Sequence, residues 1–279
     1  MYRPLGATVT AALATVAALA CMPGAAHASP SVDNIAHRGG AAYGPENTIA
    51  ACALARMQRA DACEFDIQQT KDQQLVLIHD QTLSRTTNVE QLFPDRSPWK
   101  VADFTLAEIR RLDAGSWFSS RFRGEKVPTL EEALRAMGRY NIGLLLDVKH
   151  SPGDAGIDQR VADLLKRNRS LWSGRGLVVQ AFDWNAMRSF HRMMPEVPIN
   201  LLGKPDLNKL SDLGTFAKAL SLPRSSITPE VVRAVHAKGM RVYTGPTDRP
   251  GVLRRLVSYG VDGIMTNRPG QLDSIERYW

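Results

Sequence analysis

The chain has 279 residues, of which 44% are hydrophobic and 23% are charged, with a formal net charge of +7. This composition is typical of one globular α/β domain. A basic surface suits small anionic molecules or membrane headgroups. Nucleic-acid binding is disfavoured, because the basic residues are scattered and do not gather with aromatic residues on one helix or arm; they include Lys71, Arg85, Arg96, Arg110 and Arg111.

The first 28 residues have the pattern of a secretory signal peptide. Arg3 precedes an apolar, alanine-rich run at 5–22, and the sequence AHA at 26–28 provides a cleavage site. We therefore expect cleavage after about Ala28, a secreted or periplasmic mature protein at 29–279, and a mature charge of +6, which is +7 less the charge of Arg3. A membrane anchor is disfavoured because the run is short. A lipoprotein attached through Cys21 is the other alternative.

The mature chain is expected to open with a short apolar strand at 32–36, which ends at the sequence HRGG. The sequence PENT at 45–48 then begins a helix, and either Asn47 or Thr48 can cap it. A second strand is predicted at 62–67. A third apolar run at 75–78 leads into the sequence HD.

Glu64 and Asp66 lie two residues apart on the second predicted strand, so their side chains point to the same face. Two carboxylates on one face repel each other unless a positive charge lies between them, and a hard divalent cation with oxygen ligands meets this need. A solvated strand face is the alternative for an isolated pair. Because this pair lies between His37 and His79, we favour a metal site.

Residues 81–128 interrupt the alternation of strands and helices. They contain several prolines, glycines and aromatic residues, and one predicted helix at 106–112. A connection of this length within a compact domain is normally functional. We therefore expect a small inserted lobe at about 81–128, and an excursion without function is the alternative.

From residue 129 onward, strands and helices alternate regularly. The predicted helices are 130–140, 156–167, 184–194, 207–216, 229–238 and 250–259, and the predicted strands are 142–148, 177–182, 199–202, 219–222, 241–244 and 262–266. This series predicts an α/β fold, a (β/α)8 TIM barrel with the inserted lobe after its second strand region. An open doubly wound sheet is disfavoured because no GxGxxG or GxxxxGK sequence follows the first strand.

Polar side chains recur where the predicted strands end. In a TIM barrel, the active site gathers at the carboxyl ends of the strands. The residues at or near such ends are His37, Glu64, Asp66, His79, Asp147 and Lys149. Histidines transfer protons near neutral pH, a divalent ion polarises a phosphoryl group, and basic side chains stabilise developing negative charge. Cleavage of a phosphodiester requires this combination.

The ordered motifs resemble those of the glycerophosphodiester phosphodiesterase family of TIM-barrel enzymes, which are similar to phosphatidylinositol phospholipase C. The pattern runs through HRG at 37–39, PENT at 45–48, ExD at 64–66, HD at 79–80, PTLEE at 128–132, DVK at 147–149 and GVDGI at 260–264. The resemblance covers roughly residues 32–270. Several motifs in order form a specific signal, whereas any one alone would be weak.

The resemblance implies hydrolysis of a small-molecule glycerophosphodiester to glycerol 3-phosphate and an alcohol. His37 and His79 would act as acid and base. The ligands of one divalent cation, Ca²⁺ or Mg²⁺, would be Glu64, Asp66 and Asp147. We expect Asp80 to orient or cap a neighbour and not to react. The oligomeric state stays open.

The resemblance also implies residues that bind or position the substrate. Arg38 and Lys149 would bind the phosphate, and Glu46 and Asn47 would organise the site from beside it. Phe182, at the end of its strand, either packs against the glycerol-like moiety or fills the top of the barrel. The inserted lobe would cover the substrate entrance.

The chain departs from the family pattern in two places. Asp147 stands where the family usually has Glu, and because Asp is one methylene shorter it would reach the ion through water or draw it deeper into the barrel. The family commonly has a Trp-containing run near the seventh strand, where this chain reads VYTGP at 242–246. We expect Tyr243 to replace part of that wall.

The mature chain has two cysteines, Cys52 and Cys63. Cys63 is expected to face away from the carboxylates, toward the helix layer where Cys52 should lie. Export would allow a disulfide, but we favour two buried thiols.

Two other functions are compatible with the sequence. An exported phospholipase would act on the head groups of intact phospholipid or sphingolipid and would make transient contact with a membrane surface. A catalytically inactive barrel would bind phosphate ligands, although the intact histidines and carboxylates argue against it.

Overall fold

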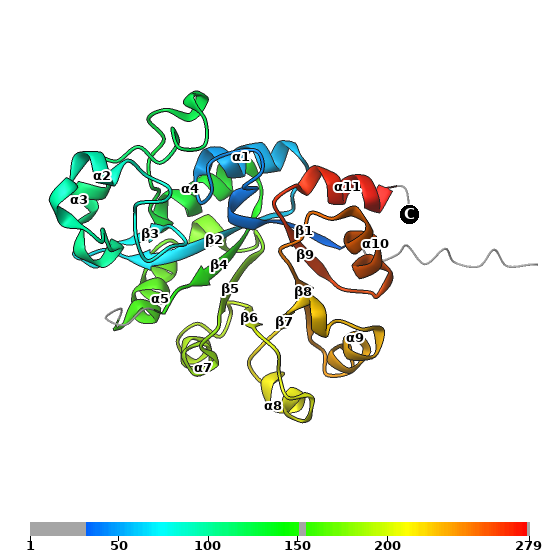
Figure 1. The fold of residues 1–279 in the computed structure, drawn as a ribbon. Coiled ribbons are helices and arrows are strands. Elements are labelled where there is room, and N and C mark those ends of the chain that lie inside the picture. Colours follow the sequence, from blue (N-terminus) through cyan, green and yellow to red (C-terminus); the bar gives the residue numbers. More distant parts are fainter. Residues whose placement is uncertain (1–31, 151–154, 278–279) are drawn as a thin grey trace, which may run out of the picture. The chain divides into compact units, whose positions relative to one another are not determined.

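The strands of the computed structural model, which describes residues 32–150 and 155–277, form a closed barrel (Figure 1). Its parallel strands are β1 (Asp33–Ala36), β2 (Ala62–Gln69), β4 (Gly143–Val148), β5 (Leu177–Ala181), β6 (Ile199–Leu202), β7 (Ala219–Leu222), β8 (Arg241–Thr244) and β9 (Gly263–Thr266). Each strand pairs with its neighbour in the order β1-β9-β8-β7-β6-β5-β4-β2, and pairing of β1 with β2 closes the ring. The short strand β3 (Leu75–Leu77) pairs antiparallel with β2. The predicted TIM barrel is confirmed.

Helices surround the barrel and cover its apolar outer face (Figure 1). They are α1 (Ile49–Met57), α4 (Leu130–Tyr140), α5 (Ile157–Arg167), α6 (Arg169–Trp172), α7 (Trp184–Met193), α8 (Leu210–Leu213), α9 (Pro229–His236), α10 (Pro250–Ser258) and α11 (Pro269–Arg277). Each helix of the described residues is too short or too polar to span a bilayer. The predicted leader, Cys21 and the cleavage position lie outside the described residues.

Several helical stretches differ from the prediction, and one of them is the short α6, which was not expected. The helix expected at 207–216 is a 3-10 turn at Leu207–Lys209 followed by the short α8. Lys209, the last residue of the turn, departs from α-helical dihedrals (φ −95°, ψ 0°), so the two segments do not form one α-helix. The helix α11 was not predicted, because it begins with a Pro-Gly pair that usually marks a turn. Leu272 and Ile275 on α11 are nevertheless buried, so tertiary packing stabilises this helix.

The inserted lobe, residues 81–128, has an apolar core that is separate from the main core around the barrel. It contains α2 (Val89–Leu92), α3 (Leu106–Ile109) and 3-10 turns at Pro94–Arg96, Val101–Asp103 and Ser120–Phe122. The predicted helix at 106–112 therefore ends at Ile109. A capping box between Thr105 and Glu108 fixes its start.

Cys52 and Cys63 form a disulfide that joins α1 to β2, so the favoured expectation of two free thiols is wrong. As predicted, Cys63 faces the helix layer, where it is buried in the main core. Gly39 has no side chain, and those of Ala51 and Ala55 are small. These residues let α1 approach the barrel closely. The Cα atoms of the two cysteines are consequently 5.9 Å apart, within the range that a disulfide spans.

We expect replacement of both cysteines by alanine to lower the free energy of unfolding by about 2–3 kcal/mol, because the bond closes a loop with a sequence separation of 11. Urea denaturation under non-reducing conditions measures the change. Reduction with dithiothreitol provides a matched control, since it should destabilise the wild-type protein alone. Equal urea midpoints for oxidised wild type and the double variant would contradict the expectation.

Candidate active site

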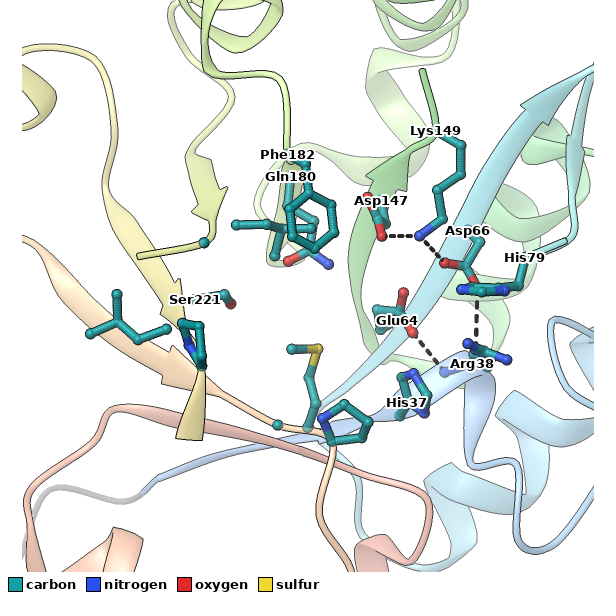
Figure 2. A pocket seen from close by; sticks show the side chains of 17 residues that line it. His37, Arg38, Glu64, Asp66, His79, Asp147, Lys149, Gln180, Phe182 and Ser221 are labelled. Carbon is teal, nitrogen blue, oxygen red and sulfur yellow. Dashed lines mark hydrogen bonds and ion pairs between the residues drawn. The ribbon is translucent and has the colours of Figure 1, made fainter. Parts of the chain in front are cut away.

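A pocket of about 380 Å³ opens at the carboxyl ends of the barrel strands (Figure 2). Of the residues predicted from the sequence, it is lined by His37, Arg38, Glu64, Asp66, His79, Asp147, Lys149 and Phe182. Glu46 and Asn47 do not line this pocket, but each bonds to a residue that does. The structure therefore gathers residues from β2, β4 and the connecting loops, including the turn that follows β1, around one cavity.

Three buried carboxylates, Glu64, Asp66 and Asp147, form an acidic trio in which one oxygen of each lies within 4.8 Å of the others. Asp66 and Asp147 are direct partners across β2 and β4. Burial raises the pKa of Glu64, and the charges of Asp66 and Asp147 raise it further. Burial likewise raises the pKa of Asp147, whose Oδ1 has no hydrogen-bond partner. This all-oxygen, undercompensated set fits a divalent cation.

Lys149 contacts the acidic trio directly. Its ammonium donates to Asp147 Oδ2, and it lies 2.8 Å from Asp66 Oδ1. Burial would raise the pKa of Asp66, but the charge and hydrogen bond of Lys149 lower it overall. Lys149, which the sequence analysis assigned to phosphate binding, thus also neutralises part of the trio.

Asn47 of the PENT segment holds the carboxylate and the backbone of Asp66. Asn47 has a left-handed backbone (φ 58°), and its side chain brackets Asp66 twice: Nδ2 donates to Asp66 Oδ2 at 2.8 Å, and Oδ1 accepts from the Asp66 N–H at 3.0 Å. Thr48, not Asn47, caps α1. Asn47 is thereby free to hold Asp66, one of the three carboxylates.

Arg38 contacts three carboxylates, of which Asp66 Oδ2 lies 3.6 Å from its Nε. Its backbone N–H donates to Glu64 Oε2 at 2.7 Å, and its Nη1 donates to Glu46 Oε1 at 2.9 Å. Arg38 itself has a positive φ of 50°. Residues other than glycine seldom adopt this backbone conformation. Here it directs the backbone N–H toward Glu64 and leaves the guanidinium at the pocket wall.

The ring of His37 is oriented by a relay that the sequence analysis missed. Its Nδ1 lies 2.8 Å from Asn267 Oδ1, and Asn267 Nδ2 donates to Asp248 Oδ2 at 2.9 Å. Because Asn267 donates to Asp248, its oxygen faces the ring, so His37 Nδ1 carries the proton and Nε2 is left with a lone pair. Burial lowers the pKa of His37, which favours the neutral ring.

The ring of His79 has an acidic partner instead. Its Nδ1 lies 2.8 Å from Asp80 Oδ1, so Asp80 orients the ring, as the sequence analysis expected. Hydrogen bonds from Arg85 are the largest cause of the low pKa of Asp80, which is about 2. The carboxylate is therefore charged at any physiological pH and can hold a protonated ring in place.

The opposite wall of the pocket is uncharged (Figure 2). Asn200, fully buried beneath it, donates to Gln180 Oε1 and Ser221 Oγ, both at 2.8 Å. Phe182 is 72% exposed at the pocket margin, so it does not fill the top of the barrel. The pocket thus has one charged side and one neutral side.

Tyr243 is not part of this wall, so that expectation is wrong. Its ring lies in a second cavity with Asp33 and Arg241, the residues that begin β1 and β8, and its hydroxyl donates to Asp33 Oδ2 at 2.9 Å. Tyr243 pairs with Gly263 at the start of β9, and its ring occupies the space that a side chain at Gly263 would need. Gly245 and Pro246, beyond the end of β8, line the active-site pocket instead.

The closed barrel, with an acidic trio and two histidines at the carboxyl ends of its strands, defines the class of protein as a TIM-barrel enzyme. Residues 37–271 match the glycerophosphoryl diester phosphodiesterase family. The chain belongs to this family and is an enzyme, a phosphoric diester hydrolase.

Individual relatives agree along almost the whole chain. A glycerophosphodiester phosphodiesterase of Caldanaerobacter subterraneus is 34% identical over 249 residues, covering 87% of this chain and 97% of the relative. One of Bacillus subtilis is 30% identical over 260 residues, covering 87% and 86%. The solved structure of an Oleispira antarctica phosphodiesterase in complex with the product sn-glycerol-3-phosphate is 27% identical, with a TM-score of 0.77, and covers 86% of this chain and 95% of that one.

Proposed function

We propose that this enzyme hydrolyses glycerophosphodiesters to glycerol 3-phosphate and an alcohol, with His37 as the first base, His79 as the first acid and one divalent cation as cofactor. The single observation that carries the assignment is the contrast between the two rings. His37 Nδ1 donates to a neutral amide, whereas His79 Nδ1 faces a carboxylate. Both side chains line one pocket, so they can act on one phosphate.

His37 supplies the lone pair for the first proton transfer. Its Nε2 takes the proton from the 2-hydroxyl of the substrate's glycerol, and that oxygen attacks the phosphorus. The burial that lowers the pKa of His37 keeps this nitrogen unprotonated near neutral pH. The substrate hydroxyl therefore acts as the nucleophile in the first step.

His79 completes the same step by protonating the oxygen of the departing alcohol as its bond to phosphorus breaks. The products of this step are the free alcohol and a cyclic glycerol phosphate. In the second step, His79 takes a proton from water and the water oxygen attacks the phosphorus. The bond to the 2-oxygen breaks, and His37 returns its proton to that oxygen, which gives glycerol 3-phosphate.

Glu64, Asp66 and Asp147 would hold the cation. When bound, it would polarise the phosphoryl group and neutralise charge on its oxygens. Arg38 contributes a guanidinium at the pocket wall, held by Glu46, for a phosphoryl oxygen. The neutral wall around Gln180, Phe182 and Ser221 would receive the glycerol carbons and hydroxyls.

The test is an assay of glycerophosphocholine and its ethanolamine, glycerol and inositol relatives in Mg²⁺, Ca²⁺ or EDTA, with products identified by ³¹P NMR. We expect glycerol 3-phosphate in the presence of a divalent ion, and a much lower rate of its formation in EDTA or with His37→Ala. Release of a phosphorylated head group with free glycerol would overturn the proposal. Turnover of lipid micelles but not of these soluble diesters would instead select a phospholipase.

We also propose that the protein is exported and has its leader removed after about Ala28. The disulfide between Cys52 and Cys63 supports this proposal, because such bonds persist chiefly in oxidising compartments. Amino-terminal sequencing of the protein from its native host tests it. A sequence that begins at residue 1 would contradict the proposal.

A further inference from the structure

Arg85 contacts Asp80 and Glu46, the partners of two active-site residues. Its guanidinium bonds two carboxylates at once: Nε and Nη2 donate to Asp80 at 2.6 and 3.0 Å, and Nη1 and Nη2 donate to Glu46 at 2.8 and 2.7 Å. Asp80 holds the ring of His79, and Glu46 holds the guanidinium of Arg38. One side chain therefore connects the residues that hold His79 and Arg38.

The inserted lobe supplies this arginine from a fixed backbone. Leu83, two residues before it, is fully buried in the lobe core, and its N–H donates to the carbonyl of Trp99. Thr87, two residues after it, donates from its hydroxyl to the Leu83 carbonyl at 2.6 Å. The backbone around Arg85 is thus anchored in the lobe, while its side chain reaches Glu46 in the loop before α1.

Charge considerations agree with this geometry. Burial would raise the pKa of Glu46, but the hydrogen bonds of Arg85 and the charge of Arg38 lower it overall. The side chains of Glu46 and Asp80 are only 10% and 28% exposed, whereas that of Arg85 is 44% exposed. Two largely buried carboxylates would lack a shared cation without Arg85, and they would be free to turn away from His79 and Arg38.

We propose that Arg85 is a positioning residue, through which the inserted lobe sets the orientation of His79 by way of Asp80 and of Arg38 by way of Glu46. Arg85 touches no reacting atom in this proposal. A planar guanidinium can bond both carboxylates with two hydrogen bonds each, which a lysine ammonium cannot do. The inference rests on the proposed roles of His79 and Arg38.

The decisive experiment compares two substrates with different needs for an acid. Glycerophosphocholine releases an alkoxide that requires protonation by His79, whereas glycerol 3-phosphate esterified with p-nitrophenol releases a phenolate that does not. For Arg85→Met we expect kcat on glycerophosphocholine to fall by about 100-fold, because a misplaced acid group costs rate on this scale. The loss on the nitrophenyl ester should be about tenfold smaller.

Arg110→Met is the matched control. Arg110 also belongs to the inserted lobe, is 37% exposed, and makes a two-pronged bond to Glu132 on α4 at 3.0 and 2.9 Å. It touches none of the active-site residues described above. We expect this variant to retain kcat on both substrates within about threefold, because rim and surface ion pairs contribute little.

Equal losses on the two substrates, or equal losses in Arg85→Met and Arg110→Met, would overturn the inference, since either result would indicate a merely structural role. If Arg85→Met does not fold, Arg85→Lys replaces it, with a smaller loss and the same dependence on the leaving group expected. If the wild-type enzyme hydrolyses neither substrate, the proposed function fails and not the role of Arg85.

Discussion

A His37→Ala variant is expected to lose about 10²–10⁴-fold in kcat on glycerophosphocholine, the range that one general acid–base group contributes. The ring lines the pocket and is fixed by its contact with Asn267, and alanine has no group that could accept the proton there. Because His37 acts through proton transfer and makes no other predicted contact with the substrate, KM should change much less than kcat. Steady-state kinetics of the purified variant measures both.

The pH dependence of the wild-type rate provides a second test of the role of His37 as base. Burial lowers the pKa of His37 from its ordinary value of 6.5. The base must be unprotonated, so activity should persist below pH 6.5 and fall as the pH drops through this lowered pKa.

His236→Ala is the control for His37→Ala, because His236 lies on α9 and bonds to Asp262, away from the pocket. We expect its kcat to match that of the wild type. Wild-type rates from His37→Ala, or an equal loss in both variants, would contradict the role of His37 as base.

Removal of the divalent ion is expected to lower the rate by about 10³-fold, because a bound ion supplies several kcal/mol of charge stabilisation. Asp147→Asn should cause a loss of similar direction and weaken metal binding, as it removes one of the three charges of the trio. Isothermal titration with Ca²⁺ and Mg²⁺ measures the binding apart from activity. Full activity in EDTA together with unchanged titrations in the variant would contradict the assignment.

Asp147→Glu is the conservative comparison, because it restores the residue that the family usually has. We expect it to retain metal binding and activity, with a changed preference between Ca²⁺ and Mg²⁺, since the longer side chain moves the carboxylate toward the pocket. A loss as large as that of Asp147→Asn would indicate that the length of Asp147 is itself required.

Metal binding should also depend on pH in a fixed direction. Without an ion, burial and mutual repulsion raise the pKa values of Glu64 and Asp147. The folded protein therefore binds these protons more tightly than the unfolded chain does, and the ion-free protein loses that stability as pH rises through the raised values. A divalent ion should consequently raise Tm more at about pH 8 than at about pH 5.

The acidic trio could be predicted because local rules determine it. Period-two alternation puts Glu64 and Asp66 on one face, and the barrel rule places Asp147 at the matching strand end, where it pairs with Asp66. The depth of a side chain within the barrel does not follow from these rules. Tyr243 shows this, because its ring lies in the cavity lined by Asp33 and Arg241, which begin their strands, and not in the active-site pocket.

The partners of the histidines could not be predicted, because they depend on contacts between distant segments. Asn267 lies 230 residues from His37, and Arg85 looked like one more scattered surface cation until the lobe brought it to Glu46. Asn267 directly follows β9, so its strand-end position was an available signal. The bond between Cys52 and Cys63 required the actual spacing of α1 and β2, which sequence periodicity does not supply.

The central claim is that one cation at the acidic trio and the two histidines act on a single phosphate. A crystal structure with Ca²⁺ and glycerol 3-phosphate tests it most directly. We predict the ion among Glu64, Asp66 and Asp147, with Nε2 of both His37 and His79 within hydrogen-bond reach of oxygens on the same phosphate. A phosphate that contacts neither ring, or an ion bound elsewhere in an active crystal, would contradict the account.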